Sequence, residues 1–178
     1  DVTLVVNVAD DLEFGGTHIS PDIDSCLHAL AGEFDETQGW GIVGDSYVVC
    51  EALGRHGLGW FRIGDRDLAH AMARTELLRA GCSLTEATIR LARARGIDAT
   101  VLPASDQAVR TVVDTDEGAL SLQEFLVLRQ ARPHVCRVRI VADPNASPTR
   151  EAMQALASSE VVIIGPSNPV ASVLPVLD

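Results

Sequence analysis

Two largely apolar runs constrain the fold of this 178-residue chain more than any other feature. Val2–Val8 and Val161–Ile164 lack a regular alternation of apolar and polar residues, which is typical of strands buried on both faces of a parallel sheet. Asp10 and Asp11 follow the first run, and the stiff turn Gly165–Pro169 follows the second. Open α/β sheets bind ligands at the carboxyl ends of their strands. The pattern predicts a parallel α/β fold with a binding site at one sheet edge.

Several segments between the two runs have helical periodicity. Pro21 suits the first turn of a helix, with Ser20 before it as the N-cap. Ser83–Glu86 is a capping box that begins another helix. Further helices are expected over 46–56 and over 65–80, the latter capped by Asp65 or Asp67. The inner face of that helix is predicted to carry Leu68, Met72, Thr75 and Leu78.

A change of period marks a separate β-rich region. Val109–Thr115 and Leu120–Leu128 flank a short turn and predict a hairpin. Val135–Val141 alternates apolar residues with Arg, as expected of a half-exposed strand. We therefore expect one α/β domain over residues 1–178, with a Rossmann-like three-layer core, a parallel sheet, and a small antiparallel β insert at 107–142.

The charge balance excludes several classes of function. The formal net charge is −11, and all fourteen basic residues are Arg. A general nucleic-acid binder needs a positive face, and a P-loop needs a Lys, so neither is expected. No apolar run approaches the roughly 20 residues that cross a bilayer. The sequence also shows no signal peptide, and its four cysteines are widely spaced, so we expect a cytoplasmic protein that does not bind membranes.

Four carboxylates near the first strand form the first candidate site: Asp10, Asp11, Asp22 and Asp24. Carboxylates this close repel one another unless a cation or hydrogen-bond donors lie between them. Mg²⁺ takes one or two carboxylates together with substrate phosphate oxygens. A structural alternative is equally consistent with the spacing: Asp22 and Asp24 would stabilise a helix N-terminus, and Asp10 would lie in a solvated turn.

Trp60–Asp67 and Gly165–Pro169 are the other candidate binding segments. In the first, an aromatic pair next to Arg62 predicts a platform for a flat ring or an anion. Asp65 and Arg66 follow, although an exposed ion-pair network at a helix start would look the same. In the second, Ser167 and Asn168 can hydrogen-bond a diphosphate or base, or can simply form a tight strand-to-helix connection. The His residues lack metal-ligand spacing, and His70 receives no role.

Six stretches, in order along the chain, resemble the 2-phospho-L-lactate transferase family, which acts in biosynthesis of the deazaflavin coenzyme factor 420. They are Val5–Asp11, His18–Asp24, Trp60–Ala69, Leu102–Asp106, Asp116–Gly118 with Gln123 and Glu124, and Ile164–Val170. The family also has a glycine-rich loop before these stretches and a carboxyl-terminal third after them. The resemblance therefore implies that this chain is a fragment lacking both ends.

The resemblance also implies a reaction and its partners. The family transfers a phospholactyl or phosphoenolpyruvyl group from a guanosine diphosphate conjugate to the ribityl hydroxyl of a deazaflavin precursor. GMP is released, Mg²⁺ is required, and a homodimer is expected. The sequence leaves open which three-carbon acid is carried, and whether the fragment is active alone. The alternative is a non-catalytic paralogue of the same fold that binds a nucleotide sugar or dinucleotide.

Roles transfer to individual residues only where the family stretches match. Asp24 and Arg62 match residues that contact the deazaflavin. Asp10 and Asp24, with Asp22 as a further candidate, become the carboxylates that hold the metal and orient the hydroxyl. Ser167 and Asn168 fall where the nucleotide donor is held. With Asp65 and Arg66 as further substrate contacts, these residues complete the predicted site.

Overall fold

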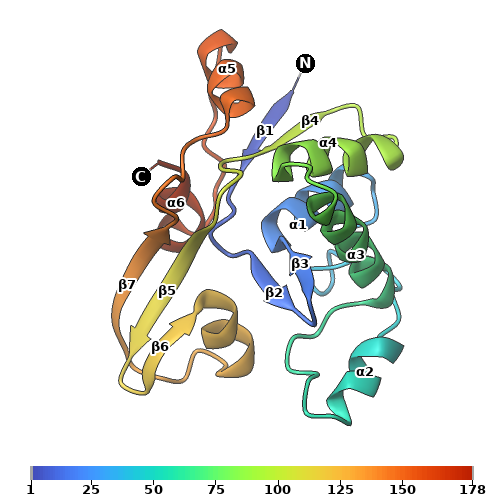
Figure 1. Ribbon diagram of the computed structural model, residues 1–178, viewed down its shortest axis with the longest axis vertical. Helices are drawn as coiled ribbons and strands as arrows, with labels where there is room; N and C mark the ends of the chain where they lie inside the picture. The colour runs from blue at the N-terminus through green and yellow to red at the C-terminus, as the bar shows by residue number, and fades with distance from the viewer. Residues whose placement is uncertain (1, 178) are drawn as a thin grey trace.

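A parallel strand pair with helices packed beside it forms the main body of the computed structural model, which describes residues 2–177. β1 (Thr3–Val6) pairs in parallel with β4 (Thr100–Pro103), with Thr3 opposite Thr100. The elements between them are β2 (Leu12–Phe14), β3 (Thr17–Ile19), α1 (Pro21–Leu30), α2 (Val48–Gly54), α3 (Asp65–Arg79) and α4 (Leu84–Ala94). In Figure 1, α1, α3 and α4 gather on one side of the strand pair, and α2 lies farther out.

The core forms where α1 and α4 face the strands. Ile23 and Leu27, one helical turn apart on α1, are completely buried against Val6 and Val101 in one apolar cluster. Burying side chains of this size contributes roughly 1.5–3 kcal/mol each. Pro21 begins α1 as the sequence predicts, and Ser83 and Glu86 form the expected capping box at α4. The carboxyl end of β1 is thereby held against the start of α1.

The antiparallel sheet has β5 in its centre. β5 (Val109–Thr115) pairs with β6 (Gly118–Ser121) on one edge and β7 (Val135–Ala142) on the other. The predicted second hairpin arm, Leu120–Leu128, is wrong beyond Ser121. There Ser121 and Glu124 bond each other's backbone N–H groups, in the manner of a capping box, and Glu124–Leu128 forms a π-helical turn, η1. These two hydrogen bonds between Ser121 and Glu124 end the strand.

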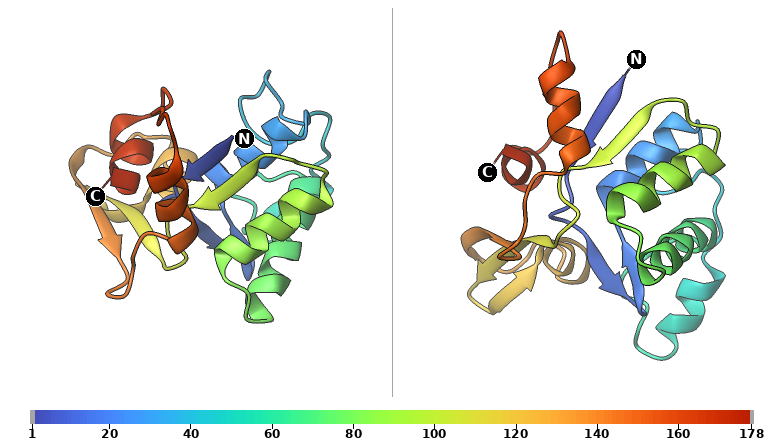
Figure 2. Two further views of the ribbon diagram at one scale, coloured as in Figure 1. Left: turned by 90° about the horizontal axis from the view of Figure 1, so that it is seen from above. Right: turned by 45° about the horizontal axis from the view of Figure 1, so that its top comes forward.

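The last segment lies on the far side of β1 from the three helices. It contains α5 (Arg150–Ser158), η2 (Pro169–Val173) and α6 (Leu174–Leu177), and both views of Figure 2 show it there. The predicted buried strand Val161–Ile164 is wrong: within residues 2–177 it pairs with no strand, and Ile163 is 85% exposed. An apolar run becomes a buried strand only when neighbouring strands offer it a ladder. The expected α/β class, with a parallel sheet and a small antiparallel region, is confirmed.

Candidate active site

Asn7 joins three distant segments at the carboxyl end of β1. Its side-chain amide Nδ2 donates to Asp22 Oδ2 over 2.7 Å and to the Ala171 carbonyl over 3.3 Å. Its Oδ1 accepts a hydrogen bond from the backbone of Ala9. The strand end, the first turn of α1 and η2 therefore meet around one side chain. This is the sheet edge at which the sequence predicts a site.

Asp10 and Asp22 lie together in this cluster. Burial, reinforced by the charges of Asp22 and Asp11, raises the pKa of Asp10 to about 7. Burial likewise raises the pKa of Asp22, against the effect of its hydrogen bond from Asn7. Asp10 Oδ1 is buried and has no hydrogen-bond partner. We call Asn7, Asp10 and Asp22 the carboxylate cluster.

A divalent cation would relieve the repulsion between the Asp10 and Asp22 carboxylates of the cluster. The donors of the cluster are hard oxygen atoms, and one of them is unsatisfied, which fits Mg²⁺ with one or two carboxylates and substrate phosphate. Among residues 2–177, no group of three or more His, Cys, Asp or Glu side chains is arranged to hold a metal. Remaining ligands would have to come from water or substrate.

Asp24 is held in a separate, buried ion pair. Arg74, which is 0% exposed, donates from Nη1 to Asp24 Oδ2 over 3.0 Å and from Nη2 to Oδ1. Arg74 also donates to the carbonyl of His18. Burial alone would raise the pKa of Asp24, but the charge and hydrogen bonds of Arg74 lower it. Both oxygens of Asp24 are therefore engaged, and it does not join Asp10 and Asp22.

Arg74 and the histidines beside it were not predicted from the sequence as site residues. The helical face was predicted from apolar residues, yet Met72 is 54% exposed and the buried residues of α3 include Ala71 and Arg74. His70 Nε2 lies 3.5 Å from Asp24 Oδ1. Burial, opposed by Asp24 and reinforced by Arg74, lowers the pKa of His70 to about 4. The only available signal was the spacing of His70 and Arg74, which places both on one face of the helix.

Asp65, on α3, caps the start of α2, and Asp45, which precedes α2, caps the start of α3. Asp65 accepts hydrogen bonds from Ser46 Oγ and from the backbone of Val48 and Val49, at the start of α2. Asp45 accepts from the backbone of Arg66 and Asp67, at the start of α3. The predicted cap of α3 by Asp65 or Asp67 is therefore wrong.

Gly64 occupies the N-cap position of α3 because of Asp45. A Cβ atom at Gly64 would overlap the Asp45 carboxylate. Arg66 bonds the Val43 carbonyl, and Arg62 lies 4.2 Å from the centre of the Tyr47 ring. None of these bonds connects the segment to the carboxylate cluster.

The aromatic pair lies at the tip of the β2–β3 hairpin. Trp60 and Phe61 each pack against Phe14, with ring centres 5.9 and 5.6 Å apart. Trp60 also borders a cavity of about 190 Å³. The other lining residues are Glu13, Phe14, Gly15, Leu53 and Leu58. An aromatic wall with a nearby carboxylate can hold one edge of a flat polar ring.

Asn168 lies close to the carboxylate cluster through η2. Its Oδ1 accepts hydrogen bonds from the backbone of Val170 and Ala171, both over 2.9 Å, and so caps η2. Ala171 is the residue whose carbonyl Asn7 binds. Ser167 is exposed beside it. The Gly165–Pro169 turn is thus brought to the sheet edge that carries Asp10 and Asp22.

Comparison with known proteins connects this geometry to a family. The model of the family described as 2-phospho-L-lactate transferase CofD matches residues 1–178. The chain belongs to the CofD family. It is 40% identical to the 2-phospho-L-lactate transferase of Methanosarcina acetivorans, over 99% of this chain and 58% of that protein. It is 36% identical to a phosphoenolpyruvate transferase of Mycobacterium ulcerans, over 97% of this chain and 55% of that protein.

Solved structures show the same fold. A crystal structure of a UPF0052 family member from Bacillus halodurans superposes with a TM-score of 0.61 at 19% identity, covering 99% of this chain and 54% of that one. The CofD-family chain thus spans somewhat more than half the length of the relatives that it matches. No helix within residues 2–177 is long and apolar enough to cross a membrane.

Proposed function

We propose that this CofD-family chain is the core of a Mg²⁺-dependent transferase. It would move a phospholactyl or phosphoenolpyruvyl group from a guanosine diphosphate conjugate to the ribityl hydroxyl of a deazaflavin precursor, with release of GMP. The observation that carries the proposal is the carboxylate cluster, with its unpartnered Asp10 oxygen beside η2. Relatives named for each of the two donors support both acids as candidates.

The proposed chemistry assigns a task to each part of the cluster. The precursor's hydroxyl oxygen attacks the phosphorus that carries the acid, and the bond from that phosphorus to the bridging oxygen of GMP breaks. GMP leaves with the bonding electrons, and Asp10 accepts the hydroxyl proton. Asp10 is the cluster carboxylate with an unpartnered oxygen, which can accept this proton. Asp10 and Asp22 would hold Mg²⁺, which when bound neutralises the phosphate oxygens.

The remaining predicted residues are proposed to bind substrate. Ser167 and Asn168 would hold the nucleotide donor beside the cluster. Arg62 and the Trp60 platform would bind the deazaflavin ring. Asp24 is 4% exposed and paired with Arg74, so it would contact the deazaflavin only if its surroundings opened. It more directly holds the start of α1 in place. We further propose, from the family resemblance, that the protein is a cytoplasmic homodimer.

The proposal is tested on the full-length protein by GMP release. GMP should appear only when Mg²⁺, the donor and the deazaflavin precursor are all present. Asp10→Asn and Asp22→Asn should each lower the rate at least about a hundredfold, the usual contribution of a positioned acid–base group. Asp98→Asn, at an exposed position, is the matched control. Wild-type rates in both cluster variants would refute the assignment.

The non-catalytic paralogue makes a different prediction. It would bind a nucleotide sugar or dinucleotide and release no GMP. Fluorescence titration with the deazaflavin precursor separates the two, because only the transferase should bind it, and Arg62→Ala should weaken that binding. Asp24→Ala needs a parallel unfolding measurement, since Arg74 would lose its buried partner.

A further inference from the structure

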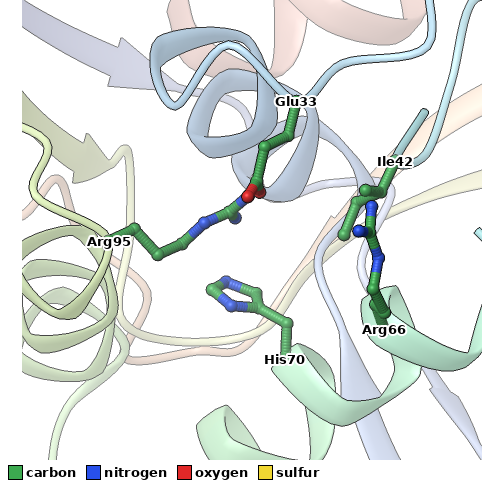
Figure 3. Close-up of a pocket in the computed structure, with 5 residues that line it drawn as sticks. All are labelled: Glu33, Ile42, Arg66, His70 and Arg95. Atoms are coloured by element: carbon green, nitrogen blue, oxygen red, sulfur yellow. The ribbon is translucent and has the colours of Figure 1, made fainter. Parts of the chain in front are cut away.

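A second cavity lies between the ends of three helices, away from the carboxylate cluster. It has a volume of about 260 Å³ and is lined by Glu33, Ile42, Arg66, His70 and Arg95 (Figure 3). We call it the basic cavity. Glu33 follows α1, Arg66 lies in the first turn of α3, and Arg95 follows α4. About 12 Å of helix separates Asp22 from the last residue of α1, which Glu33 follows, whereas His70 reaches Asp24 in the first turn of α1.

Arg95 is held in place by groups around the cavity. Its Nη1 lies 2.9 Å from His28 Nδ1, and its Nη2 contacts Glu33. His28 is buried, and its Nε2 lies 3.1 Å from Asp67 Oδ1. Asp67 and His28 therefore fix the guanidinium from behind. An arginine ordered in this way loses little further freedom when it binds an oxyanion.

Arg66 and His70 supply the other polar groups. The Arg66 side chain is 56% exposed. Its Nη2 donates to the Val43 carbonyl and its Nε lies 3.9 Å from Asp45 Oδ1, which leaves Nη1 free to donate to a ligand. The His70 side chain is only 10% exposed, and its buried Nε2 lies 3.5 Å from Asp24 Oδ1. Figure 3 shows the imidazole below the Arg95 guanidinium, with the Arg66 guanidinium across the cavity from both.

We propose that the basic cavity binds a small phosphate-class oxyanion, either inorganic phosphate or the phosphoryl group of a phosphomonoester. Two guanidinium groups can offer paired N–H donors to tetrahedral oxygens. Glu33 already places a carboxylate on Arg95, and it is 46% exposed at the rim. The oxyanion takes the place of Glu33 on Arg95.

Calorimetric titration with inorganic phosphate tests the site at pH 7.5 and constant ionic strength. Arg66→Gln and Arg95→Gln should each weaken phosphate binding about tenfold or more, as expected for a lost charged hydrogen bond. Glu33→Gln should strengthen binding by removing the competing carboxylate. Arg93→Gln is the matched control, because Arg93 is exposed on α4 and does not line the cavity.

Separate titrations with methyl phosphate and acetate identify the ligand class. Phosphate or methyl phosphate binding that depends on both arginines supports the site, and the tighter of the two indicates the natural source. Acetate binding as tight as phosphate would overturn the proposal. Equal phosphate affinity in the wild type, Arg66→Gln and Arg95→Gln would do the same. Circular dichroism checks folding, and if Arg95→Gln is unfolded, the exposed Arg66 decides the result alone.

Discussion

Replacing Arg74 by Met should leave Asp24 as an unpaired charge in the protein interior. Asp24 is 4% exposed, and its two oxygens accept hydrogen bonds from Arg74. Met has a similar length and no charge, so the substitution removes the ion pair while keeping most of the volume. Breaking a buried pair on one side costs about 3–5 kcal/mol. That is a large share of the roughly 5–15 kcal/mol that stabilises a typical domain.

Removing both charges should cost much less than removing one. Buried ion pairs can be replaced by well-packed apolar residues with little or no loss of stability. We therefore expect Asp24→Leu with Arg74→Met to be more stable than Arg74→Met alone. The double-mutant cycle should give a coupling free energy of about 3 kcal/mol, near the upper end for residues in direct contact.

Urea unfolding at pH 7.5, followed by circular dichroism, measures each free energy of unfolding. The dependence on urea concentration should stay constant among variants if the unfolded states are comparable. Arg79→Met is the matched control, because Arg79 lies on the same helix but is 62% exposed in its pair with Glu76. It should cost less than about 1 kcal/mol. A coupling below about 1 kcal/mol between Asp24 and Arg74 would refute the reasoning.

Two further predictions concern His70 and the start of α3. The folded-state pKa of His70 is about 4 against 6.5 unfolded, so the unfolded chain binds the extra proton between these values. The stability that the neutral imidazole provides is present above pH 6.5 and is lost towards pH 4, by about 3 kcal/mol. The difference in unfolding free energy between wild type and His70→Gln should therefore change by that amount between pH 7.5 and pH 4. A difference that stays constant over this range would contradict the prediction. Gly64→Ala should lower the melting temperature, because the new Cβ atom would displace the Asp45 carboxylate that caps α3. Asp45→Ala should lower the free energy of unfolding by about 1 kcal/mol. Equal melting temperatures for Gly64→Ala and wild type would contradict the steric argument.

Elements specified by neighbouring residues were predictable from the sequence. The start of α1 at Pro21, the capping box of α4 and the alternation in β5 depend on contacts within a few residues or on a simple period. The carboxylate cluster was partly predictable for the same reason, because Asp10 and Asp22 lie close to the end of one strand and the start of the next helix. The capping exchange of Ser121 with Glu124 is equally local, but the apolar residues that follow it favour a strand when only the sequence is considered.

Contacts between distant residues were decided by the tertiary structure. Asn7 meets Ala171, and Asp24 meets Arg74, only because packed elements bring their side chains together. Sequence spacing indicates which residues share a helix face, but it does not indicate which oppositely charged residue on another element will pack against that face. The apolar run Val161–Ile164 shows the same limit. The apolar composition of this run determined only that its side chains favour burial. Whether neighbouring strands are present to bury them was decided by the tertiary structure.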